Sequence, residues 1–510
     1  MKTVILPIGF ASLFPASLLS QNIAEQLPNI IMIVADDVGY GDLHCYAASG
    51  VNTVKTPHVD RLAKEGCMFT DAHACAATST PSRYGILTGL YPWRRQDTGI
   101  AAGDAKLIIS PETLTLADVM KSAGYHTAAI GKWHLGLGAE TGRQDWNTTV
   151  APGPKEIGFD YSYIMAATAD RTPCVYMENQ RVVNLDPKDP IEVSYTHNFP
   201  GQPTGKSHPE LLTKLKPSHG HDMSIVNGIS RIGYMRGGRK ALWKDENIAD
   251  SITAHAVKYI EEHSRTDQPF FLYFCTNDIH VPRVPHPRYA GATDMGPRGD
   301  AIAQFDGSVG QVLAAIDSMG ITQNTLVILT SDNGPVVDDG YQDQAVEKLG
   351  RHKPWGPFRG GKYSAFEAGT RVPFIVRWPA GKVRAGSKSR ALISHVDLMG
   401  SLAKIVSSPE YIPADSRDEL AALLGKTEIG RAYVIEASHT LSVISDGWKY
   451  IEPKEGNSYQ QSTNTELGIL AQPQLYDLVH DPAEYTNVAS DNPEIVKRLQ
   501  EILERERKKL

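Results

Sequence analysis

Residues 29–37 read NIIMIVADD, an uninterrupted apolar run that ends in two aspartates. A short continuous apolar run is typical of a strand that is buried on both faces of a sheet. The same pattern recurs three times: HTAAI at 126–130 before Lys132 and His134, PFFLYF at 269–274 before His280, and TLVILT at 325–330 before Asp332 and Asn333. We therefore expect residues 29–35 to form one of several strands of a covered sheet.

Amphipathic segments lie between these runs, at residues 59–65, 114–123, 248–263 and 302–319. Strands that alternate with helices predict an α/β fold, with a large, mostly parallel sheet between two layers of helices. The carboxyl ends of parallel strands meet at one edge of such a sheet. The four polar strand ends are therefore expected to form one site.

Three segments are predicted along the chain. Residues 1–21 combine Lys2, an apolar run and a small polar end, which is typical of a signal peptide. A membrane anchor is the alternative, but prolines interrupt the run and no later stretch approaches the roughly 20 apolar residues of a spanning helix. Residues 22–408 are expected to form the catalytic domain. Residues 409–510 are expected to form a small α+β domain with a short antiparallel sheet.

Composition narrows the possible partners. The formal charge of −7 provides no general basic field, so we expect no nucleic-acid partner. The five cysteines include no C-x-x-C pair, which favours free thiols over a disulfide framework. Residues 140–247 are rich in Pro, Gly and Asp, and such long irregular insertions often shape a pocket mouth.

A loop at residues 79–89 reads STPSRYGILTG. Pro81 and the apolar residues after it predict a helix that begins here, where backbone N–H groups favour an anion. Arg83 adds a fixed positive charge. Taken alone, the motif is equally consistent with a helix cap and a surface arginine.

Read together with the strand ends, this loop resembles the signature of the formylglycine-dependent sulfatases, a family of the alkaline phosphatase superfamily. Residues 131–136, GKWHLG, resemble the family's second signature. The other landmarks follow in the family's order: Asp36-Asp37, His280-Val281-Pro282, Asp332-Asn333-Gly334, Gly360-Gly361-Lys362 and the stretch from Glu367 to Pro373. The resemblance extends from residue 29 to about residue 373, and the tail resembles the family's small C-terminal domain.

The resemblance implies that Ser79 is oxidised to formylglycine (3-oxoalanine) and that a calcium ion lies beside it. The implied calcium ligands are Asp36, Asp37, Ser79, Asp332 and Asn333. The residue types agree with that choice, because oxygen ligands select a hard cation such as Ca²⁺ over zinc.

The resemblance also assigns roles in the reaction. One hydroxyl of hydrated formylglycine would attack sulfur, the alcohol would leave, and the second hydroxyl would expel sulfate. Arg83 would hold the matured residue, and Lys132 and Lys362 would bind sulfate oxygens. His134 would deprotonate the nucleophile, and His280 would protonate the leaving oxygen. Histidine suits acid–base chemistry because its pKa is near neutrality.

Charged residues of the long insertion are candidates for sugar binding. They are Asp170, Arg171, His219 and His221, with the stretch 236–239 as a further candidate. Solvated loop charges are the equally weighted alternative. The overall pattern is similar to bacterial carbohydrate sulfatases that act on sulfated galactose or N-acetylgalactosamine, and we favour the 6-O-sulfate.

Position 79 is Ser where the family more often has Cys. This resembles the Ser-type enzymes of anaerobic bacteria and implies an anaerobic sulfatase-maturing enzyme as partner. With the signal peptide, it leads us to expect an exported, periplasmic enzyme that acts on sulfated glycans. Two alternatives stay open: a phosphoester or phosphonate hydrolase of the same superfamily, and a catalytically silent sulfoglycan-binding protein if Ser79 is not matured.

Overall fold

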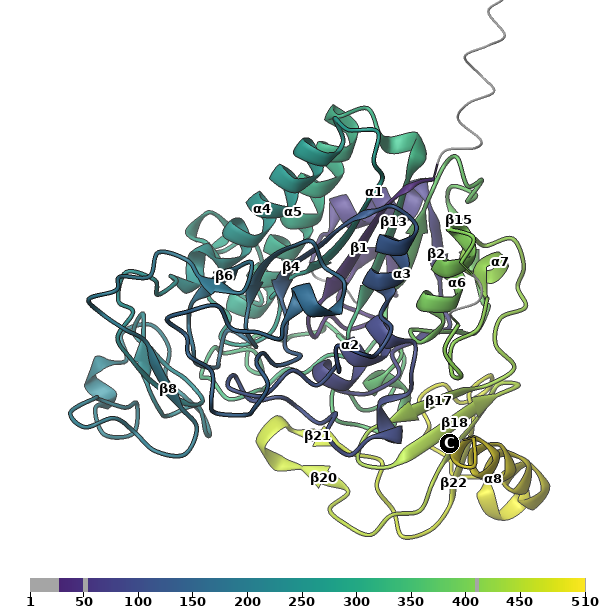
Figure 1. The fold of residues 1–510 in the computed structure, drawn as a ribbon. Helices are drawn as coiled ribbons and strands as arrows, with labels where there is room; N and C mark the ends of the chain where they lie inside the picture. The colour runs from purple at the N-terminus through teal and green to yellow at the C-terminus, as the bar shows by residue number, and fades with distance from the viewer. Residues whose placement is uncertain (1–26, 49–53, 409–411, 510) are drawn as a thin grey trace, which may run out of the picture.

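A ten-stranded sheet runs through the computed structural model of the protein (Figure 1). The structure describes residues 27–48, 54–408 and 412–509, so the predicted signal peptide lies outside the described residues. The strands are, in order across the sheet, β15 (Ser387–Ser389), β2 (Cys67–Phe69), β14 (Phe374–Arg377), β13 (Thr325–Ser331), β1 (Asn29–Ala35), β12 (Phe270–Cys275), β4 (His126–Lys132), β5 (Tyr161–Met165), β6 (Tyr176–Glu178) and β7 (Arg181–Val182).

The five central strands β13, β1, β12, β4 and β5 are parallel, whereas antiparallel pairs involve β14 on one side and β6 and β7 on the other. The four apolar runs of the sequence are four of the five strands of this parallel block, namely β13, β1, β12 and β4. The predicted mixed, mostly parallel sheet is thus confirmed.

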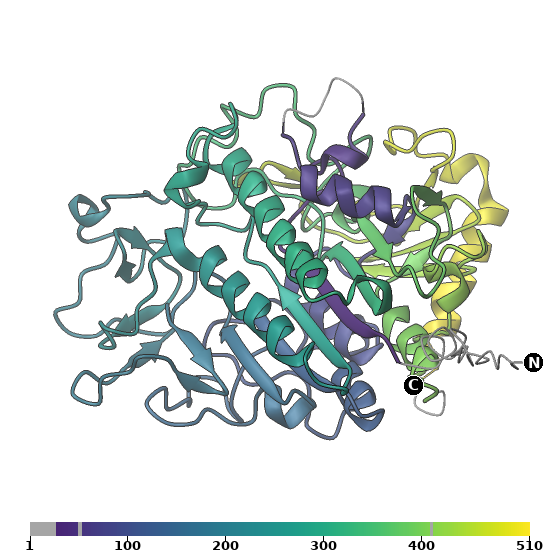
Figure 2. The ribbon, with the colours of Figure 1, turned by 90° about the horizontal axis from the view of Figure 1, so that it is seen from above.

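Helices cover both faces of the sheet, as Figure 2 shows from above. Alternate residues of β1 face opposite layers: Ile30, Met32 and Val34 belong to one apolar core, and Ile31 and Ile33 to the other. The first core contains α2 (Ser79–Thr88), α3 (Leu116–Ser122), α6 (Asp397–Ile405) and α7 (Leu420–Leu423), and the second contains α1 (Pro57–Glu65), α4 (Ile248–His263) and α5 (Gly296–Ser318). Burial on both faces explains why β1 has no polar alternation.

The insertion at 140–247 is more regular than expected. It supplies β5, β6 and β7 to the main sheet, because residues 161–165 pair in parallel with β4. The remainder contains the small ladders β8 (Glu192–Ser194) with β11 (Tyr234–Arg236) and β9 (Ile225–Val226) with β10 (Ile229–Ser230). In Figure 1 the part around β8 projects to one side of the sheet.

The C-terminal part contains a separate antiparallel sheet, as predicted. Its strands are β17 (Val434–Ala437), β18 (Leu441–Ser445), β19 (Trp448–Ile451) and β22 (Gln474–Asp477). The terminal helix α8 (Pro493–Arg507) packs on this sheet through Leu499, Ile502 and Leu503. A small hairpin of β20 (Tyr459–Gln460) and β21 (Thr465–Glu466) projects from it towards the main domain. A two-strand ladder of β3 (Ala72–His73) and β16 (Ile393–Ser394) lies apart from both sheets.

All five cysteines are free, as expected from their spacing. Within residues 27–48, 54–408 and 412–509, every helix is too short or too polar to cross a bilayer.

A buried charge cluster joins the two parts of the chain. His73 contacts Asp71 (2.8 Å) through Nε2 and Glu436 of β17 (2.7 Å) through Nδ1. Lys449 of β19 contacts Glu436 (3.0 Å) and Glu367 (2.9 Å) of the short helix η8 (Glu367–Gly369). We call these five residues the interdomain cluster. Burial would lower the pKa of His73, but hydrogen bonds to Asp71 and Glu436 outweigh it and raise the pKa from 6.5 to about 9.

The interdomain cluster predicts a pH-dependent stability. Between pH 6.5 and 9, His73 keeps its proton in the folded state and loses it in the unfolded state, so the free energy of unfolding falls as pH rises through this window. Replacement of His73 by Gln should lower Tm at pH 6.5 and flatten the decline towards pH 9. Differential scanning calorimetry across this range measures both effects.

The matched control is His208→Gln, which changes an exposed histidine of the insertion. Its Tm should follow that of the wild type at every pH. Parallel curves for His73→Gln and the wild type would contradict the assignment of a buried imidazolium to His73.

Candidate active site

The site lies where the central strands end, above the N-terminus of α2. Asp36 and Asp37 directly follow β1, Lys132 is the last residue of β4, and Asp332 directly follows β13. Ser79 is the first residue of α2, as the sequence predicted. The sheet therefore brings residues that are about 300 positions apart into contact, with the Asp37 N–H 3.2 Å from Asp332 Oδ1 across a separation of 295 residues.

The five predicted calcium ligands form one connected group. Asn333 donates from Nδ2 to Asp37 Oδ1 (2.8 Å) and accepts at Oδ1 from Ser79 Oγ (3.2 Å). The side chains of Asp36, Asp37, Asp332 and Asn333 are all almost fully buried. Asp37 has a left-handed backbone (φ 61°), a conformation that is uncommon for a non-glycine residue and is often found at functional sites.

Three cations contact these carboxylates. Arg83 donates twice to Asp332 Oδ2 (3.0 and 2.8 Å), and Lys362 donates to Asp37 Oδ2 (2.9 Å). Lys132 lies 2.5 Å from Asp36 Oδ1 and 2.9 Å from Ser79 Oγ. Buried charges are tolerated only when they are paired in this way.

The electrostatics differ between two of these carboxylates. Burial would raise the pKa of Asp332, but the charges of Arg83 and Lys132 outweigh burial and hold it well below its usual range. For Asp36, burial dominates and raises the pKa to about 8, although Lys132 opposes the rise. Asp36 Oδ2 is also buried without a hydrogen-bond partner among the described residues. A hard cation would satisfy that oxygen, and Asp36, Asp37 and His280 are close enough to share an ion.

His134 and His280 are both buried beside Ser79 and both favour the neutral form. Burial, reinforced by Lys132, holds the pKa of His134 well below its usual range, and burial, reinforced by Lys362, lowers the pKa of His280 to about 4. Each ring bonds a backbone carbonyl, His134 through Nε2 (3.0 Å to Ala101) and His280 through Nδ1 (2.8 Å to Val281). These nitrogens must carry the protons, because a carbonyl only accepts.

The other nitrogen of each ring is then a free base. His134 Nδ1 is buried with no hydrogen-bond partner among the described residues. His280 Nε2 lies 3.9 Å from Asp37 Oδ2. The two imidazoles, which follow β4 and β12 along the chain, thus each keep a lone pair in the cavity that Ser79 also lines.

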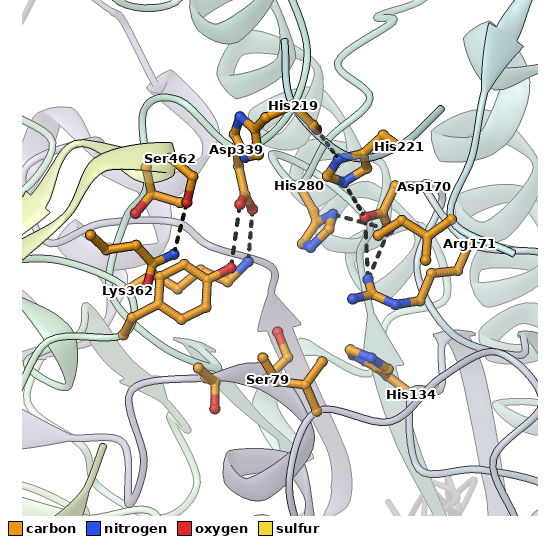
Figure 3. Close-up of a pocket in the computed structure, with 16 residues that line it drawn as sticks. Ser79, His134, Asp170, Arg171, His219, His221, His280, Asp339, Lys362 and Ser462 are labelled. Atoms are coloured by element: carbon orange, nitrogen blue, oxygen red, sulfur yellow. Dashed lines mark hydrogen bonds and ion pairs between the residues drawn. The ribbon is translucent and has the colours of Figure 1, made fainter. Parts of the chain in front are cut away.

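A cavity of about 210 Å³ opens above Ser79 (Figure 3). His134, His280 and Lys362 line it, as do all four predicted sugar-binding residues, Asp170, Arg171, His219 and His221. Lys132 differs from the prediction in position, because it lies beneath Ser79 and outside the cavity lining. Of the two predicted lysines, Lys362 lines the cavity and Lys132 contacts Ser79 from outside the cavity lining.

One wall of the cavity is a compact ionic group. Asp170 accepts from Arg171 Nη1 (3.0 Å) and contacts His221 Nε2 (3.0 Å), and Figure 3 shows these side chains facing Ser79 from the same side. Burial would raise the pKa of Asp170, but Arg171 and His280 hold it well below its usual range. Burial would lower the pKa of His221, but the hydrogen bond that the ring makes to Asp170 raises it overall.

The stretch 236–239 does not contribute to this wall, contrary to one expectation. Arg236 pairs with Glu192, and Arg239 lies 3.0 Å from Asp189, in exposed positions outside the cavity lining. These arginines are solvated loop charges, which was the alternative interpretation.

Sequence reasoning missed part of the opposite wall. Asp339 accepts hydrogen bonds from Lys362 Nζ (3.1 Å) and from the Tyr363 hydroxyl (3.3 Å). The signal in the sequence that could have identified it was its position seven residues after Asp332. Gln460, Ser462 and Thr463 also line the cavity. They come from the β20–β21 hairpin of the C-terminal part, and nothing in their local sequence indicated a site.

Comparison with known proteins agrees with this geometry. The Sulfatase family model matches residues 28–408. An N-acetylgalactosamine-6-O-sulfatase of Bacteroides thetaiotaomicron is 53% identical over 94% of this chain and 93% of its own length. Human arylsulfatase A is 29% identical over 93% of this chain and 87% of its own length.

The fold of this chain also matches the folds of solved structures. One from a study of glycosaminoglycan metabolism by Bacteroides thetaiotaomicron superimposes with a TM-score of 0.91 at 53% identity, covering 94% of this chain and 99% of that one. A phosphonate monoester hydrolase of Agrobacterium radiobacter shares the fold, with a TM-score of 0.54 at 18% identity over 93% of this chain and 94% of that one. The fold is therefore common to several hydrolases, whereas the family match and the near-complete alignment at 53% identity are specific. The chain belongs to the sulfatase family and is a sulfuric ester hydrolase.

Proposed function

We propose that this sulfatase removes the 6-O-sulfate of N-acetylgalactosamine units in glycans. The observation that carries the proposal is the 53% identity, over nearly the whole of both chains, to a sulfatase named for that reaction. The cavity supports it, because its 210 Å³ volume and polar walls suit one sugar unit placed with its sulfate over Ser79.

The wall formed by Asp170, Arg171 and His221 supplies the recognition of the sugar. A carboxylate accepts hydrogen bonds from hydroxyls and a guanidinium donates them, so the pair suits adjacent hydroxyls of one ring. The three side chains already hold one another, which reduces the entropy lost when a sugar binds. A substrate that lacks a matching hydroxyl would forfeit the hydrogen bonds that these paired charges offer to the sugar, which lowers its affinity relative to the matched substrate.

The sulfate group would meet Lys362, His280 and His134, which line the cavity around Ser79. The Lys362 ammonium attracts the sulfate oxygens. A bound anion also favours the protonated form of a neighbouring imidazole, so substrate binding raises the proton affinity of His280 Nε2. That nitrogen can then give its proton to the departing sugar oxygen.

We further propose that Ser79 is matured to formylglycine and that Asp36, Asp37, Asp332 and Asn333 hold a calcium ion beside it. Together these groups would supply an oxygen nucleophile with a second hydroxyl for turnover, and a cation that lowers the proton affinity of that nucleophile. The partnerless Asp36 Oδ2 and the all-oxygen donor set support the fit.

The chain's own residues then act on that position. His134 Nδ1 accepts the proton of the nucleophile, because it is a neutral, buried lone pair without a partner among the described residues. Lys132, 2.9 Å from Ser79 Oγ, stabilises negative charge on the same oxygen. Arg83 holds Asp332, which keeps the acidic group in place beneath the site.

Export and maturation complete the proposal. The pattern of residues 1–21 supports a signal peptide and a periplasmic location. Because Ser stands at position 79, oxidation would require an anaerobic sulfatase-maturing enzyme of the host.

A substrate panel tests the function. Matured enzyme should desulfate N-acetylgalactosamine 6-sulfate, and should hydrolyse p-nitrophenyl sulfate faster than p-nitrophenyl phosphate or a phosphodiester, since the cavity is built for a sulfate monoester on a sugar. The measurement is kcat/KM for each compound.

The same panel separates the alternatives. A clear preference for phosphoesters would point to the phosphohydrolase alternative and refute the proposal. Activity confined to glucosamine or uronic acid sulfates would refute the assigned sugar. Tight binding of the sulfated sugar without turnover by fully matured protein would support the silent binding protein.

Calcium removal provides a separate prediction. Without the cation, the buried Asp36 Oδ2 has no partner among the described residues, so chelation with EGTA should lower Tm and abolish turnover. Calcium should restore both. Asp332→Asn should lose the calcium-dependent rise in Tm, whereas Asp338→Asn, which changes a half-buried loop residue outside the ligand group, should retain it. A Tm that does not respond to EGTA or calcium would contradict the proposed calcium site.

A further inference from the structure

Arg283 is a buried arginine that connects two of the chain segments around the active-site cavity. It pairs with Asp343 through Nη1 (2.8 Å), and both side chains are almost fully buried. Residues 279–283, which we call the His280 loop, are thereby held against residues 335–343, which we call the Asp339 segment. The guanidinium also donates to carbonyls of both segments, namely Ile279 (2.9 Å), Val337 (2.8 Å) and Val336 (3.1 Å).

The His280 loop determines where the His280 ring lies. The ring donates to the carbonyl of Val281, which belongs to the same loop (2.8 Å), so its orientation follows the loop backbone. One end of the loop is fixed at the sheet, because the Ile279 N–H donates to the carbonyl of Asp36 (2.7 Å). The guanidinium of Arg283 fixes the other end.

The Asp339 segment determines where Lys362 lies. The Lys362 N–H donates to the carbonyl of Pro335 (2.9 Å), and the Lys362 ammonium donates to Asp339 (3.1 Å). These two acceptors lie on either side of the two carbonyls that Arg283 contacts. Figure 3 shows Asp339, Lys362 and His280 around the space above Ser79. Arg283 therefore links the positions of two groups that face the same cavity.

The contact between the two segments also has an apolar part. Val281 of the His280 loop packs with Tyr341 of the Asp339 segment and with Ile229 of the insertion. Apolar contacts are not directional, whereas a guanidinium presents its N–H donors in a rigid planar fork. The apolar cluster can hold the segments together, but the hydrogen bonds of Arg283 fix how they are placed relative to each other.

We propose that Arg283 is a positioning residue for catalysis, which holds His280 at the spacing from Lys362 that lets the imidazole protonate the leaving oxygen of a bound sulfate ester. The inference rests on the proposed function, because that function gives His280 and Lys362 their roles. Arg283 is not among the residues that line the cavity, so it acts through His280 rather than on the substrate.

The test varies the leaving group, because only a poor leaving group needs a proton from His280. N-acetylgalactosamine 6-sulfate must release a basic sugar oxygen, whereas p-nitrophenyl sulfate releases a stable phenolate. Arg283→Lys keeps a positive charge for Asp343 but replaces the planar fork by a single donor nitrogen. On matured enzyme, this variant should lower kcat for the sugar sulfate at least about tenfold more than kcat for p-nitrophenyl sulfate, since general acid catalysis contributes about 10²–10⁴-fold. The change in KM should be smaller than the change in kcat.

The matched control is Arg431→Lys. Arg431 is also buried and lies outside the cavity lining. Its guanidinium likewise donates to one carboxylate and to two carbonyls, namely Asp397 (2.7 Å), Tyr433 (3.0 Å) and Asp415 (3.2 Å). A loss of folded enzyme lowers turnover of both substrates equally, so this variant should keep the wild-type ratio between them. An unaltered ratio in Arg283→Lys would overturn the inference.

A double-mutant cycle with His280→Ala provides a second measurement. When the imidazole is absent, the residue that positions it has little left to contribute, so Arg283→Lys should cause almost no further loss of kcat on the sugar sulfate. A further loss as large as that caused by Arg283→Lys alone would show that Arg283 acts independently of His280.

Asp343→Asn replaces Arg283→Lys if the latter does not fold. It weakens the pairing of the guanidinium but leaves its carbonyl contacts, so the ratio between the two substrates should fall in the same direction by a smaller factor. A ratio equal to that of the wild type counts against the positioning role.

Failure of the proposed function is recognised separately, because the wild type would then not turn over N-acetylgalactosamine 6-sulfate. The ratio is in that case measured between phenyl sulfate, whose leaving oxygen is the more basic, and p-nitrophenyl sulfate. A lower ratio in Arg283→Lys than in Arg431→Lys supports the positioning role, and equal ratios overturn it.

Discussion

The pairing of three buried cations with three buried carboxylates is the constraint on which the rest of the site depends. Asp36, Asp37 and Asp332 stand at the ends of two neighbouring parallel strands. Lys362 and Arg83 each contact one of them, and Lys132 contacts two, Asp36 and Asp332. Removal of one member of a buried pair typically costs about 3–5 kcal/mol, because it leaves an unpaired buried charge. The array is therefore held in one geometry, and Ser79 is fixed within it by Lys132 and Asn333.

Two buried atoms of this array have no hydrogen-bond partner among the described residues: one oxygen of Asp36 and one nitrogen of His134. Such atoms are unfavourable in a resting protein. The proposed calcium ion would satisfy the Asp36 oxygen, and the proton of the proposed nucleophile would satisfy the His134 nitrogen.

Much of the fold and of the site was predictable from sequence, because local sequence patterns indicate the central strands and the polar residues at their ends. The apolar run at 29–35 and its three counterparts fixed the central strands, and the polar residues after each strand then had to meet. The contacts of Asp170 with Arg171 and His221 were harder to predict from sequence, since they depend on how an insertion of about 100 residues packs. Its strands β5 to β7 were missed because a short strand beside Pro and Gly has a weak periodic signal.

The contribution of the C-terminal part was the least predictable. Gln460 and Thr463 reach the cavity only because the hairpin that contains them is held against the main domain, where Arg359 pairs with Glu466 at 2.6 Å. The buried contacts of Lys449 with Glu367 and Glu436 join the same two parts. Contacts between residues so distant in sequence leave no local pattern, so the specificity of the enzyme was less apparent from sequence than its chemistry.

The central claim is that the geometry around position 79 serves an oxidised residue. Mass spectrometry of the peptide that contains residue 79, on protein isolated from its native host and fractionated by activity, tests it most directly. The account predicts that the peptide has lost two hydrogen atoms relative to serine, and that turnover rises in proportion to the modified fraction. Full sulfatase turnover by protein with an unmodified Ser79 would contradict it.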